Sequence, residues 1–147
     1  MIYPVLVHFH SITRWLLLIS LLMSLLLTLF FWLKKKPGVL SLKKIFAMTG
    51  GLAHTQLLLG IILYFVSPRV VFSSLAMKDP QIRFYTVEHI TMMILAILLI
   101  TIGMLAGRKI GDELKYTRKV FIYYLAALLL ILMAIPWPWG SHAGGWY

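Results

Sequence analysis

Apolar residues fill four long stretches of the chain, which short polar connections separate. The stretches cover about residues 11–33, 45–66, 86–107 and 120–136. A helix rises about 1.5 Å per residue, so roughly 20 residues cross the ~30 Å hydrocarbon layer of a bilayer. None of the stretches alternates apolar and polar residues with the period of two that marks a half-buried strand. The pattern therefore predicts four transmembrane helices.

The connections predict how these helices are arranged. Inside lipid every backbone N–H and C=O group must be paired within its own segment, which only helices and closed barrels achieve. Short connections make neighbouring helices antiparallel, so the sequence predicts an all-α, up-down four-helix bundle that forms a single transmembrane domain over residues 1–147. Residues 67–85 mix basic and apolar side chains and are expected to lie along the membrane interface.

Composition supports lipid as the main solvent. The 147 residues are 61% hydrophobic and only 12% charged, against roughly 25% charged in an ordinary soluble domain. This composition excludes a typical water-soluble fold. The chain has no cysteine, which also excludes disulfides, iron–sulfur clusters and cysteine-ligated zinc.

The basic residues predict the orientation of the bundle. Five lie in the connection 34–44 and five in 108–119, whereas 67–86 holds three and the N-terminal segment only Arg14. Lysine and arginine are retained on the cytoplasmic side, so both termini are expected on the outer, periplasmic side of a bacterial inner membrane. The net charge of +10 is then a topology signal and requires no nucleic-acid partner.

Several ionisable or polar residues lie where lipid should exclude them. Such groups are expensive inside a span, usually face the bundle interior and often mark function. The candidates are His8, His10, Arg14, His54, Gln56, Glu88, His89 and His142. At about 1.5 Å per residue, His10 lies about 36 Å from Lys34 and His89 about 28 Å from Arg108, whereas His54 lies only about 15 Å from Lys44. His10 and His89 are therefore expected to share a site near the outer face, and His54 to lie near mid-membrane.

The chemistry that best suits this set is b-type haem. Two imidazoles from facing helices close both axial positions of the iron without covalent attachment. His10 and His89 are the preferred pair, and Arg14, Arg83 or backbone N–H groups are expected to neutralise the propionates. His54 is expected to hold a second haem with Met23 or to bond to a quinone carbonyl, and Gln56 is a further candidate cofactor contact.

Other readings of these residues stay open. The outer group could instead hold zinc or copper through imidazole and carboxylate ligands; the members of that set are His8, His10, Glu88, His89 and His142. Any one of the histidines could also be a simple interfacial residue. The chain has no Ser-His-Asp ordering, no glycine-rich phosphate loop and no H-E-x-x-H motif, which favours an electron-transfer subunit over a stand-alone enzyme.

Four groups of residues together resemble a known family. They are His8-Phe9-His10-Ser11 with Arg14-Trp15, Ala53-His54-Thr55-Gln56 with Gly60, Arg83-Phe84 with Val87-Glu88-His89, and Ile135-Pro136-Trp137-Pro138. In helix order, loop length and histidine positions, nearly the whole chain resembles small four-span bacterial membrane proteins commonly labelled cytochrome B. The resemblance implies a membrane protein that binds b-type haem. Larger cytochrome b families place both ligands of one haem at matching depths, and the single mid-membrane histidine here favours one outer haem over a two-haem chain.

Two functional hypotheses follow. In the first, the protein carries haem b and exchanges electrons with quinone or a partner redox protein. In the second, it is a haem-free accessory subunit that packs against a larger respiratory or transport complex through its glycine and alanine faces. Other respiratory membrane subunits or further copies of this chain are the expected protein partners in either case.

Overall fold

The computed structural model describes residues 2–35, 39–106 and 112–140, and within these ranges it is mostly helical with no strand. The long helices are α1 (Ile2–Lys34), α2 (Lys43–Val66), α4 (His89–Ala106) and α5 (Glu113–Ala134). Short pieces complete the described chain: η1 (Val39–Leu42), η2 (Ser74–Met77), α3 (Pro80–Arg83) and the π-helix η3 (Phe84–Glu88). Because α3 and η3 run directly into α4, Pro80–Ala106 forms one continuous helical span. The predicted all-α class with four helices long and apolar enough to cross a membrane is confirmed.

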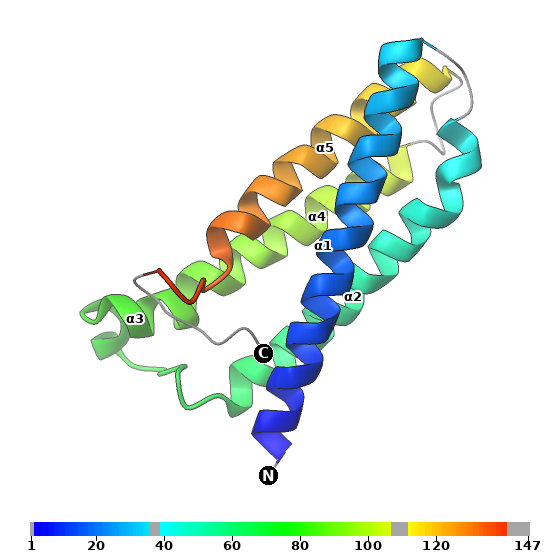
Figure 1. The fold of residues 1–147 in the computed structure, drawn as a ribbon. Helices are drawn as coiled ribbons and strands as arrows, with labels where there is room; N and C mark the ends of the chain where they lie inside the picture. Colours follow the sequence, from blue (N-terminus) through cyan, green and yellow to red (C-terminus); the bar gives the residue numbers. More distant parts are fainter. Residues whose placement is uncertain (1, 36–38, 107–111, 141–147) are drawn as a thin grey trace.

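The four long helices pack side by side in a ring. Each contacts its two neighbours in the order α1, α2, α4, α5 and back to α1. Figure 1 shows that the α1–α2 pair and the α4–α5 pair diverge toward the end where the chain begins, and that α3 lies at this end. The two pairs are therefore farther apart at that end of the bundle.

The long helices begin earlier than the apolar stretches do, and capping residues set the starts of two of these helical spans. The Asp79 carboxylate accepts hydrogen bonds from the backbone N–H groups of Gln81 and Ile82, and Pro80 occupies the first helical position, where its missing N–H is harmless. Asp112 caps α5 in the same way. The segment predicted to lie along the interface at 67–85 therefore ends in a helix that continues into the third span. The first helix likewise extends back to Ile2, well before residue 11.

A close-packed seam holds the bundle together away from the divergent end. Leu21 of α1, Ile100 of α4 and Tyr124 of α5 are fully buried there. The Phe46 ring of α2 meets the Tyr124 ring edge-on with centroids 5.8 Å apart. Gly103 of α4 makes this approach possible, since a Cβ at that position would lie 3.0 Å from the Tyr124 ring.

Hydroxyl groups bond α1 to α2 across their interface. The Ser20 hydroxyl lies 2.6 Å from the Thr49 hydroxyl, and the Ser24 hydroxyl lies 3.1 Å from it. All three side chains are buried. Small polar residues of this kind allow close helix approach in lipid, where water cannot compete for the hydrogen bonds.

The outward surface of the bundle is apolar. Large hydrophobic side chains such as Ile19, Leu58 and Met133 are 61–72% exposed. A water-soluble monomer rarely exposes a continuous apolar surface of this kind. The exposed surface and the helix lengths together indicate a multi-pass membrane protein in contact with a lipid bilayer.

Replacing Gly103 by alanine should destabilise the bundle. The added methyl group would press on the Tyr124 ring at 3.0 Å and on Tyr123 Cβ at 3.1 Å, and overpacking of this kind costs about 1–3 kcal/mol. Gly51→Ala is the matched control because nothing lies within 4 Å of its added Cβ, so alanine there should be neutral or stabilising by up to about 1 kcal/mol. Unfolding in mixed micelles would measure both. Equal stability of the two variants would contradict the packing described.

Candidate functional site

A cavity of about 410 Å³ lies inside the divergent end of the bundle. All four long helices line it, together with the chain just after α2 and just after α5. Its walls are mostly apolar, with Leu57, Ile61, Ile97 and Ile131 among them. Its size falls within the roughly 300–1,000 Å³ range of small-molecule and cofactor sites.

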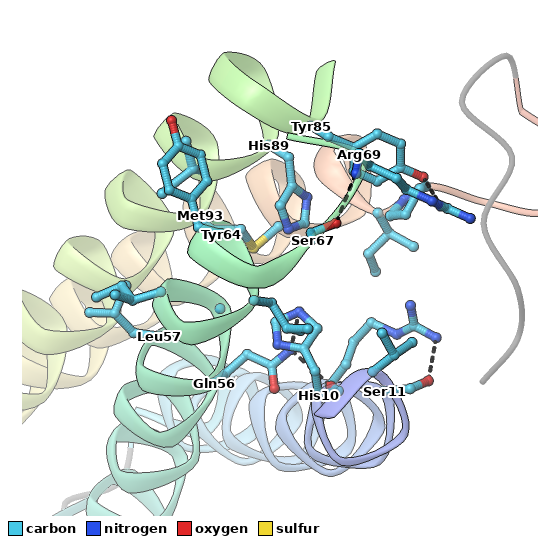
Figure 2. Close-up of a pocket in the computed structure, with 18 of the residues that line it drawn as sticks. His10, Ser11, Gln56, Leu57, Tyr64, Ser67, Arg69, Tyr85, His89 and Met93 are labelled. Carbon is cyan, nitrogen blue, oxygen red and sulfur yellow. Dashed lines mark hydrogen bonds between the residues drawn. The ribbon is translucent and has the colours of Figure 1, made fainter. Parts of the chain in front are cut away.

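His10 and His89 lie on opposite sides of this cavity. Figure 2 shows the His10 ring reaching in from α1 and the His89 ring reaching in from the start of α4. The structure thus brings together the two histidines that the helix-depth arithmetic paired. Gln56 and Met93 line the same cavity, one from α2 and the other from α4, one helical turn beyond His89.

A single hydrogen bond fixes the orientation of the His89 ring. Its Nδ1 lies 2.8 Å from the carbonyl oxygen of Ala134. Ala134 is the last residue of α5, and the last carbonyls of a helix lack partners within that helix. Because a carbonyl can only accept, His89 Nδ1 carries the proton and donates it. The lone pair of the imidazole is therefore on Nε2, which is the arrangement that metal-ligating histidines usually show.

A π-helical turn sets the position from which His89 projects. The His89 backbone N–H bonds to the Phe84 carbonyl, five residues earlier, at the end of η3. The Thr86 carbonyl within this turn accepts a 2.9 Å hydrogen bond from the Tyr64 hydroxyl of α2. Single π-turns of this kind occur mostly within α-helices and frequently at functional sites.

His10 is held by Gln56. The Gln56 amide nitrogen lies 3.0 Å from the His10 carbonyl oxygen and 3.1 Å from His10 Nε2. The Gln56 side-chain oxygen accepts a hydrogen bond from the Thr13 hydroxyl. Gln56 is buried, so these contacts fix the carboxamide at both ends.

The charged side chains that line the cavity are cations. Arg14 donates a 3.0 Å hydrogen bond to the Ser11 hydroxyl. Arg69 donates a 2.8 Å bond to the Tyr85 hydroxyl, and its guanidinium lies 5.1 Å from the centre of the Tyr85 ring. No Asp or Glu is among the described residues that line the cavity. The site therefore favours a ligand that is apolar over most of its surface and carries negative charge.

Arg83 was expected to neutralise the propionates, but it lies away from the cavity. Its Nε lies 2.6 Å from a carboxylate oxygen of Glu88, and neither residue lines the cavity. Arg69 is the second cation of the site, and sequence reasoning missed it. The available signal was its position, since it follows shortly after the end of α2, at the end of the bundle where the cavity lies.

His54 and Met23 lie outside the cavity. His54 Nδ1 is 2.6 Å from the Gly50 carbonyl, and His54 Nε2 is 3.4 Å from the Thr101 hydroxyl of α4. Both ring nitrogens thus have protein partners, and neither partner is Met23. Met23 is 49% exposed on the outer surface of α1.

The remaining candidates bear on the alternative of a zinc or copper site. His8 lines the cavity beside His10, whereas His142 lies outside the described residues. Within residues 2–35, 39–106 and 112–140, no group of three or more His, Cys, Asp or Glu side chains is close enough to hold a metal ion. One histidine is, however, sufficient to hold an iron whose other four ligands come from a porphyrin.

No protein-family profile matches the chain, and no curated protein or solved structure is significantly similar to it. The functional assignment therefore depends on the geometry of the cavity.

Proposed function

We propose that the protein is a membrane cytochrome that holds b-type haem in the cavity between the two helix pairs and passes single electrons. The observation that carries the proposal is the His89 imidazole, which lines the apolar cavity opposite His10 and has its Nε2 lone pair uncommitted. The family resemblance of the histidine motifs supports the same assignment.

The cavity residues fit the parts of a haem. His89 would be the iron ligand, with its tautomer set by the Ala134 carbonyl, and His10 lies on the opposite side of the cavity. The apolar walls suit the porphyrin plane, and Arg14 and Arg69 suit the two propionates. Haem would supply one-electron redox chemistry, while the protein binds it, orients it and shields it from water.

Electron exchange with quinone or with a partner redox protein follows from the position of the cavity. The cavity lies at one end of the bundle, so a bound cofactor would be close to one membrane face. The described basic residues of the connections 34–44 and 108–119 lie at the other end of the bundle. By the positive-inside rule we therefore expect the cavity on the periplasmic side of a bacterial inner membrane. The protein then serves as an electron-transfer subunit.

A haem-free accessory subunit is the second candidate, and the outer face of α2 favours it. Ala47, Gly51 and Thr55 recur at intervals of four residues and are exposed on this face. Such stripes of small residues let helices from another subunit or another copy approach closely in lipid. Co-purification without haem would support this candidate.

Replacing His89 should abolish haem binding. Protein purified from haem-replete cells should show a reduced-minus-oxidised haem spectrum, and His89→Gln should lose it because a carboxamide is a poor iron ligand. Glutamine can still donate a hydrogen bond to Ala134, so the helical fold should persist in circular dichroism. Imidazole added to His89→Gly should restore the spectrum. His54→Ala is the control and should keep its haem, and a colourless wild-type protein would refute the proposal.

Removing the charge of Arg69 should weaken haem binding. A charge-assisted hydrogen bond contributes about 1.5–3 kcal/mol, so Arg69→Gln should lower affinity about 10-fold or more when apo-protein is titrated with haemin. Arg83→Gln is the matched control, because Arg83 pairs with Glu88 away from the cavity. Haemin dimethyl ester, whose propionates are uncharged, should bind the wild type and Arg69→Gln with similar affinity. If the affinity for the dimethyl ester falls as much in Arg69→Gln as the affinity for haemin does, Arg69 does not act on the propionates.

Reporter fusions would test the orientation. Alkaline phosphatase fused after residue 147 should be active and a fluorescent protein there should be dark, because both ends are expected in the periplasm. Fusions within residues 34–44 should give the reverse pattern. Replacing the five lysines of that connection by glutamine should yield mixed orientations. A fluorescent C-terminal fusion would invert the proposed topology.

A further inference from the structure

The two histidines of the cavity are in different hydrogen-bonding states. His89 donates from Nδ1 to Ala134 and keeps the Nε2 lone pair available. His10 instead has the Gln56 amide nitrogen 3.1 Å from its Nε2. His10 can bind iron only if one of its ring nitrogens keeps an uncommitted lone pair.

The orientation of the Gln56 carboxamide is determined by its other contacts. The same nitrogen lies 3.0 Å from the His10 carbonyl oxygen, and a carbonyl accepts only from a donor, so this end of the amide must be the NH₂ group. The opposite end accepts from the Thr13 hydroxyl. Exchanging the two ends would place the amide oxygen against the His10 carbonyl oxygen. One hydrogen of the NH₂ group therefore goes to the carbonyl and the other to His10 Nε2.

This contact fixes the tautomer of His10. A neutral imidazole has one donor nitrogen and one acceptor nitrogen, and Nε2 is the acceptor here. The proton is then on Nδ1, which is buried and has no hydrogen-bond partner in the described part of the chain. His10 thus has no uncommitted lone pair, and it has one N–H group without an acceptor.

The surroundings hold the His10 ring in this state. A Cβ at Gly60 of α2 would lie 3.5 Å from His10 Cε1, so the ring packs against the α2 backbone where Gly60 has no side chain. Gln56 comes from the same face of α2, one turn earlier. Turning Nε2 into the cavity would break the Gln56 contact and leave a buried amide hydrogen unpaired, which is unfavourable.

We propose that Gln56 is a positioning residue that keeps His10 off the iron, so that His89 is the one axial ligand and the opposite axial position accepts a small neutral diatomic molecule such as carbon monoxide. This inference rests on the proposed haem function. Binding is a reversible dative bond to reduced iron, with no net electron or proton transfer.

Spectra of the purified holoprotein with carbon monoxide as probe test the proposal. The reduced wild type should be high-spin and five-coordinate, and carbon monoxide should shift its Soret band. His10→Ala should keep its haem and stay five-coordinate. Gln56→Leu, which has a similar volume but no donor, should release His10 to the iron, convert the spectrum to low-spin and lower carbon monoxide affinity at least 10-fold. The double variant Gln56→Leu with His10→Ala should return to the five-coordinate spectrum.

Controls separate the possible failures. Thr55→Val, on the exposed face of α2 beside Gln56, should leave the spin state unchanged. A low-spin wild type that becomes high-spin in His10→Ala would overturn the inference and leave the haem assignment intact, and this comparison does not depend on Gln56→Leu folding. A five-coordinate Gln56→Leu protein would also overturn it. A colourless wild type would instead overturn the proposed function itself.

Discussion

The hydrogen bond from His89 to the Ala134 carbonyl is the contact on which the site depends. It satisfies two groups that would otherwise be unpaired inside the bundle, an imidazole N–H and one of the last carbonyls of α5. Unpaired polar groups in lipid cost several kcal/mol each, so the ring and the helix end hold each other in place. The same bond selects the tautomer that leaves Nε2 available. One hydrogen bond therefore both caps the end of α5 and leaves His89 Nε2 available to a ligand.

The divergence of the helix pairs determines where ligand chemistry is possible. Toward the end that carries the basic connections, Tyr124, Phe46 and Ile100 fill the interior and Gly103 allows them to interlock. Toward the other end the pairs separate, and the space between them is lined by histidine, glutamine and arginine among apolar residues. Polar residues inside a membrane protein are strongly destabilising unless they pair with one another or contact a ligand. Elsewhere in the described core, the buried Ser20, Ser24 and Thr49 hydroxyls follow the same rule by pairing with one another.

The fold was largely predictable from the sequence, and the site only in part. Four apolar stretches and the lipid constraint on the backbone specify four helices. Asp79-Pro80 and Asp112 are recognisable helix N-caps in the sequence, but the pattern of apolar stretches does not include them. Helix rise alone placed His10 level with His89. It could not supply the partners of His54, which depend on how α2 rotates against α4, nor the pairing of Arg83 with Glu88, which depends on the π-turn. Arg69 was missed because it lies in a connection whose path no periodicity describes.

Gln56 shows why two histidines at one depth do not by themselves define a ligand pair. Spacing and depth can place two imidazoles across a cavity from each other. Whether each has a lone pair available depends on which hydrogen-bonding groups contact its ring nitrogens. A backbone carbonyl beside His89 can only accept and so frees its distal nitrogen, whereas a carboxamide beside His10 donates and occupies one. The identity of the neighbouring polar group thus decides whether such a site is closed by the protein on both sides or left open on one.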